Sequence, residues 1–121
     1  MKILLPLAAV AALGVGPAYA ACAYPKAPES IPDGGTSTLE QMLAGQRAVK
    51  AFDAAITEYQ SCLENEHNAA LAANPDLTEE QKKERANILT QKMNAAVDEA
   101  QALADRLNAQ IRVYREKNAK K

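Results

Sequence analysis

One proline divides the chain into two helical halves. On either side of Pro75, apolar residues recur every three or four positions, over 37–73 and 78–117, the spacing of one face of an α-helix. Proline cannot continue the first helix and disfavours helical geometry in Asn74, which can take a left-handed cap. Helices joined by only about four residues, 74–77, pack as antiparallel neighbours. The sequence therefore predicts an all-α fold, an antiparallel two-helix hairpin.

Both helices carry a start signal. Ser37 and Glu40 have the spacing of a capping box, and so do Thr78 and Gln81. The expected core positions of the first helix are Met42, Gly45, Val49, Phe52, Ile56, Tyr59, Leu63, Glu66 and Ala70. Those of the second are Ala86, Leu89, Met93, Ala96, Ala100, Leu103, Leu107, Gln110 and Tyr114, with Ile88 off the pattern. Beside the first set lies a small-residue row, formed by Ala48, Ala55, Cys62 and Ala69.

The first 20 residues have the layout of a secretion signal. Lys2 supplies a positive charge, an apolar run follows over 3–15, and Ala18-Tyr19-Ala20 offers small residues for cleavage after Ala20. The run is shorter than the about 20 apolar residues that a membrane span needs. We therefore expect a signal peptide over 1–20, a single domain over 21–121, and a periplasmic or secreted protein.

Two cysteines in an exported chain predict one disulfide, Cys22–Cys62. Two alternatives stay open. One is an unpaired thiol pair. The other is a lipoprotein modified on Cys22, although Tyr19 stands where lipid-modified signals usually have an aliphatic residue.

A proline-containing arm, 21–36, precedes the first helix. Pro25, Pro28 and Pro32 favour extended backbone, and Asp33-Gly34-Gly35 is a turn signal. Such an arm reaches about 46 Å, whereas the helix from Ser37 to Cys62 rises only about 37 Å. We expect the arm to fold back along the first helix, over the small-residue row.

Charge and motifs indicate no catalytic, cofactor-binding or nucleic-acid site. The formal net charge is −1, and the basic C-terminal residues suit a helix end and solvated tail better than an anionic lipid or polysaccharide. These residues are Arg112, Arg115, Lys117, Lys120 and Lys121. The single histidine, His67, follows Glu64 at a metal-ligand spacing, but a di-metal bundle needs a second such motif. A metal-binding helical dimer is one alternative function.

The pattern Cys22-x-Tyr24-Pro25, Pro28, Ile31-Pro32-Asp33-Gly34, Thr38, Gln41-Met42 and Tyr59-x-x-Cys62-Leu63 resembles a family of small exported proteins of Gram-negative proteobacteria. The resemblance covers most of the chain after the signal, and the cysteine spacing is its most specific part. It implies a periplasmic or secreted location and supports the disulfide. The members of that family have no known catalytic or binding residues to carry over to this chain.

The second helix has an apolar face wider than one antiparallel partner covers. Val97, Ala104 and Ile111 lie beside its core positions and form the predicted contact surface. We expect a homodimer, which would be a four-helix bundle, or an envelope protein as partner. The predicted function is a non-enzymatic interaction or structural protein. A further alternative is an envelope chaperone or inhibitor that holds its partner along the alanine-rich face of the first helix.

Overall fold

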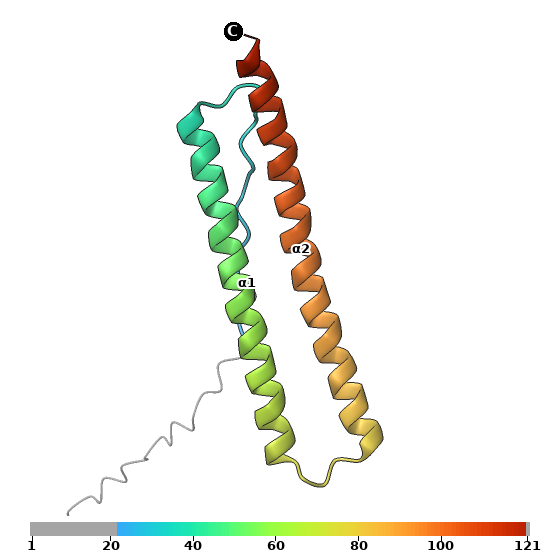
Figure 1. Ribbon diagram of the computed structural model, residues 1–121. Helices are drawn as coiled ribbons and strands as arrows, with labels where there is room; N and C mark the ends of the chain where they lie inside the picture. Colours follow the sequence, from blue (N-terminus) through green and yellow to red (C-terminus); the bar gives the residue numbers. More distant parts are fainter. Residues whose placement is uncertain (1–21, 121) are drawn as a thin grey trace, which may run out of the picture.

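The computed structural model describes residues 22–120, and over that range two long helices pack side by side (Figure 1). Helix α1 spans Leu39–Ala73 and helix α2 spans Glu79–Ala119. They run antiparallel, so the predicted all-α hairpin is confirmed. The predicted signal peptide, 1–20, lies outside the described residues. None of the described helices is both long and apolar enough to cross a membrane.

The start of α1 differs from the prediction. Thr38, not Ser37, is the N-cap: its hydroxyl accepts from the Gln41 N–H at 3.2 Å, and the Thr38 N–H donates to the Gln41 side chain at 2.8 Å. Ser37 belongs instead to the preceding turn, where its N–H donates to the Asp33 carbonyl at 2.9 Å. The helix therefore begins at 39 rather than 37.

The other helix ends are close to those predicted. Thr78 and Gln81 form the expected capping box of α2. Helix α2 continues to Ala119, two residues past the predicted end, so part of the basic tail is helical. Asn74 caps α1 without a left-handed conformation (φ −126°), because its side-chain amide donates to the Ala70 carbonyl at 2.7 Å.

A narrow apolar core lies where the helices face each other. Its central cluster contains predicted core residues from both helices: Val49, Phe52, Ile56, Ala96, Leu103 and Leu107. Leu103 is only 1% exposed, and full burial of such a side chain contributes about 1.5–3 kcal/mol. Large residues of α1 face Ala96 and Ala100, so the helices interdigitate as expected. Ile88, which did not fit the pattern, is exposed.

The arm is a third layer. It runs lengthwise between the two helices (Figure 1), and Ala27 and Ile31 pack against the central cluster. The expectation that it would lie on α1 alone is therefore incomplete. Polar groups of α2 also hold the arm: Glu99 accepts from the Tyr24 hydroxyl, and the Gln110 side chain accepts from the Gly34 N–H. Ile31 meanwhile packs against a cluster that both helices form.

Candidate functional site

The start of the described chain is attached to the middle of α1. Cys22 and Cys62 form a disulfide with a Cα–Cα distance of 5.8 Å, and no cysteine is left free. The bond joins positions 40 residues apart, and a loop of that length stabilises the fold by roughly 4 kcal/mol in the chain-entropy model. The arm thus has a covalent tether at one end and the helix start at the other.

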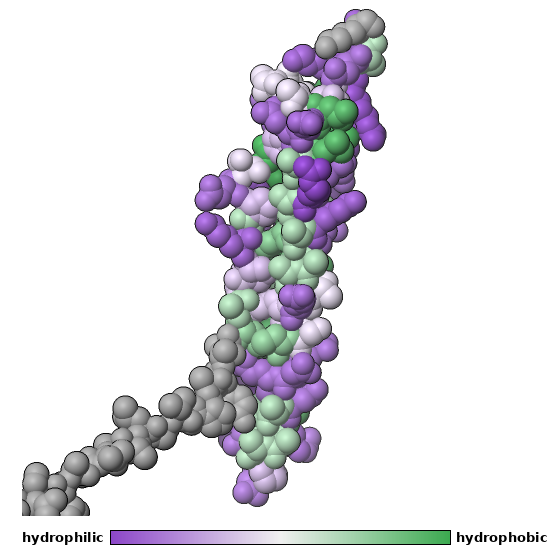
Figure 2. Space-filling view, turned by 90° about the vertical axis from the view of Figure 1, so that its left-hand side faces the viewer, coloured by the Kyte–Doolittle hydropathy of each residue, from purple (hydrophilic) through white to green (hydrophobic). Residues whose placement is uncertain are grey.

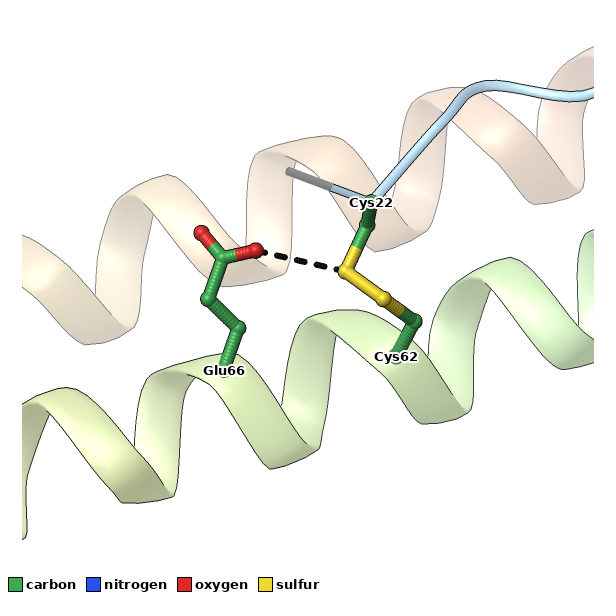
Figure 3. The surroundings of a disulfide bond; sticks show 3 residues. All are labelled: Cys22, Cys62 and Glu66. Carbon is green, nitrogen blue, oxygen red and sulfur yellow. Dashed lines mark hydrogen bonds between the residues drawn. A yellow bond between two sulfur atoms is a disulfide. The ribbon is translucent and has the colours of Figure 1, made fainter. Parts of the chain in front are cut away.

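A carboxylate lies beside this bond. Glu66, one turn after Cys62, places Oε2 3.3 Å from Cys22 Sγ (Figure 3). A disulfide sulfur carries no proton, so it donates nothing to the carboxylate while the bond is intact. The negative charge instead opposes the approach of an attacking thiolate, since thiol–disulfide exchange proceeds through anionic sulfur.

An open groove on α1 adjoins the disulfide. Polar residues of α1 border it, and alanines form its floor on the side toward the turn; the lining includes Thr57, Glu58, Asn65, Glu66, Ala69, Ala70 and Ala73. Cys22 and Cys62 both lie in its wall. The disulfide is therefore accessible from the surface. Across the face of α1 in Figure 2, weakly hydrophobic and hydrophilic residues alternate, and the most hydrophobic residues gather near the end away from the turn.

Tyr24 joins the arm to both helices. Its ring meets the Tyr59 ring of α1 edge to face, with centroids 5.1 Å apart, and its hydroxyl donates to the Glu99 carboxylate of α2. Desolvation, followed by the hydrogen bond to Glu99 and the charges of Glu99 and Tyr59, raises the pKa of Tyr24 to about 12. The side chain as a whole is still 45% exposed, so this contact is at the surface.

Two glycines anchor the other end of the arm. A methyl group on Gly34 would clash with the Gln110 carbonyl and lie 2.8 Å from the Tyr114 nitrogen. One on Gly45 would lie 2.6 Å from the Pro32 ring. The Gly34 N–H also donates to the Gln110 side chain at 2.9 Å, and Lys117 donates to the Gly35 carbonyl. At this end of the arm, the arm backbone and the Pro32 ring are therefore in close contact with both helices.

The three residues of the predicted contact surface differ in their exposure. Val97 is 49% exposed, whereas Ala104 is half-buried. Ile111 packs against the central cluster and is also half-buried. The prediction that this face is wider than one antiparallel partner covers is therefore wrong for Ile111, because the helix seam covers part of it. Val97 is the exposed member of the surface.

The described residues bring no metal-ligand cluster together. No group of three or more histidine, cysteine and acidic side chains suited to a metal occurs in 22–120. His67 and Glu66 share a shallow groove with Arg85 and Lys92 of α2, whose positive charges oppose a cation. Glu64 is exposed on the outside of α1.

Sequence reasoning missed the groups of α2 that receive the arm. Glu99, Gln110 and Lys117 are polar helix residues with no local signal for this role. Gly45 offered one signal, because a glycine at a core position of a helix indicates close approach of another segment. No protein-family model matches the chain, and comparisons with curated proteins and with solved structures return no match either.

Proposed function

We propose that the protein is a non-enzymatic, periplasmic or secreted interaction protein that binds its partner along the open side of α2. The observation that carries the proposal is the one-sided position of the arm. Tyr24 and Gly34 contact α2 through Glu99 and Gln110. Residues two apart on an α-helix point about 200° from each other, so Val97 faces away from the arm contacted by Glu99.

The open side presents apolar surface in the middle of a long helix. Val97 keeps about half of its surface in water, and Ala104 and Ile111 continue the same side toward the C-terminus. Apolar surface that stays exposed, most of all at Val97 and in part at Ala104 and Ile111, is typical of a contact surface. A second copy of the chain or an envelope protein would cover it, and two copies would form a four-helix bundle.

A second candidate function rests on the alanine-floored groove of α1. Beyond the Cys22–Cys62 disulfide, this groove continues along α1 over Ala69, Ala70 and Ala73. An envelope chaperone or inhibitor would hold a partner segment there. This candidate uses α1 rather than α2, so position-specific crosslinking separates the two.

The test places a photo-crosslinking residue at Val97 or Ile88 of the exported chain. The two side chains are 49% and 46% exposed, and nine residues of helix place them on opposite sides of α2. We expect a defined adduct, with a second copy or another protein, from position 97 and none from 88. Val97→Glu should weaken that association by about tenfold or more without loss of helicity, whereas Ile88→Glu should not. Equal adducts from both positions, or none from 97, would refute the proposal.

A further inference from the structure

We propose that residues 22–30 of the arm form a redox-released strap: reduction of Cys22–Cys62 frees them from the hairpin while the helices stay folded. The strap and the segment that follows it are held very differently. Residues 31–38 are anchored by close packing of Pro32 on Gly45 and Gly34 on α2. Residues 22–30 depend on the disulfide, on Tyr24 and on the packing of Ala27 against the central cluster.

Little else retains the strap. In the described part of the chain, no backbone–backbone hydrogen bond joins 22–32 to either helix. Pro25 and Pro28 have no N–H to lose, and the ion pair of the segment, Lys26 with Glu29, is internal and moves with it. Segments with few buried contacts and solvated backbone are the ones that open at low free energy.

The disulfide is placed where a reductant can reach it. Both sulfurs lie in the wall of the open groove on α1. A dithiol would supply the two electrons: its thiolate attacks one sulfur, forms a mixed disulfide and releases the other cysteine as a thiolate, which takes a proton. The second thiol of the reductant then displaces the remaining cysteine, so Cys22 and Cys62 end as thiols and the reductant as a disulfide. Glu66 makes this exchange slow by repelling the attacking thiolate.

Release has a structural consequence at the seam. When residues 22–30 leave the hairpin, the Tyr24 ring separates from Tyr59 and Ala27 no longer packs on the central cluster. Apolar surface between the helices, on the side away from Val97, then becomes accessible. This inference does not depend on the proposed binding along α2, because the strap and Val97 lie on opposite sides of that helix.

The test is nuclear magnetic resonance of the exported chain, oxidised and after dithiothreitol. Backbone order parameters of 22–30 should fall from about 0.85 to below about 0.6, while those of both helices stay near 0.85. Ring contacts between Tyr24 and Tyr59 should disappear, and the Gly34 amide resonance should stay in place. The Cys22→Ser/Cys62→Ser variant should reproduce the released state without reductant, and reoxidation of the natural chain should reverse it.

Two outcomes would overturn the proposal. If 22–30 stays as ordered in the reduced chain as in the oxidised one, the non-covalent contacts suffice to hold the strap. If the helices lose order together with the arm, the disulfide stabilises the whole fold and does not merely hold residues 22–30 in place. Helicity by circular dichroism, measured on the same reduced sample and on the double serine variant, distinguishes these two outcomes.

Discussion

Gly34 lies directly against the backbone of α2. Its φ is not positive, so the glycine is required for space and not for an unusual conformation. The neighbouring Gly35 has more room, since a methyl group there would lie 3.1 Å from the side chain of its own turn residue, Asp33. The two positions form a matched pair that separates close packing from glycine flexibility.

Gly34→Ala should therefore destabilise the protein by about 2 kcal/mol, the usual cost of forcing extra volume into a packed contact. Gly35→Ala should cost less than about 1 kcal/mol, because only a side chain has to shift. Thermal unfolding of both variants, with the disulfide intact, measures the difference. Equal melting temperatures would show that the arm does not pack on α2 as described.

Tyr24 predicts a stability change at high pH. Its pKa is about 12 in the folded protein, against 10.0 for the ordinary phenol. A raised pKa means that the folded state holds the phenol proton more strongly than the unfolded state does. The protonated Tyr24 therefore makes its full contribution to the free energy of unfolding below pH 10, and this contribution is lost as the pH rises toward 12. The melting temperature should fall over that window in the natural chain and fall less in Tyr24→Phe. Parallel curves for the two proteins would contradict the Glu99 contact.

Buried apolar residues could be predicted from the sequence, and the partners of the arm could not. Val49, Phe52 and Leu103 repeat at helical spacing, so one-dimensional pattern is enough to place them in the core. Glu99 looks like any solvated helix residue, and Gln110, although it falls at a core position of the pattern, has no feature that indicates a hydrogen bond to the arm. Their role depends on the path of a segment about 75 residues earlier in the chain, and local pattern holds no information on that path.

At the scale of elements, helix type and pairing follow from periodicity, but one helix start does not. Ser37–Glu40 and Thr38–Gln41 both have capping spacing. The Asp33 turn decides between them, because its carbonyl accepts the N–H groups of Thr36 and Ser37. Ser37 is then part of the turn, and Thr38 is the first residue free to cap. Competition between adjacent local motifs explains the shift of the N-cap by one residue, from Ser37 to Thr38.

Removing the cap tests this assignment. Thr38→Ala should destabilise the protein by about 1 kcal/mol, the typical value of an N-cap hydroxyl, whereas Ser37→Ala should change it by less than about 0.5 kcal/mol. Chemical denaturation of the two variants measures both values. A larger loss from Ser37→Ala than from Thr38→Ala would restore Ser37 as the cap.

The arm is the element whose route the sequence predicts only in part. Reach and proline content indicate an extended segment that returns toward Cys62. They do not distinguish a path on α1 alone from a path between the helices. Ile31 decides, because burying it against the central cluster requires the groove that both helices form.

At the scale of the whole molecule, the arm makes the hairpin asymmetric. Two helices alone have a thin core for a chain of this size, and the arm adds a third layer and a covalent tie on one side only. That side is closed while the disulfide is intact, and the side of α2 with Val97 remains open. The proposed release of residues 22–30 requires the Cys22–Cys62 bond, and such a bond is expected in an exported chain.

Intact mass of the protein recovered from the producing cell's envelope or medium tests export and this bond most directly. We predict a single species that begins at Ala21 and is lighter by two hydrogens than the fully reduced chain, with the difference abolished by a dithiol. A species that retains residues 1–20, carries a diacylglyceryl group on Cys22, or shows two free thiols would contradict it.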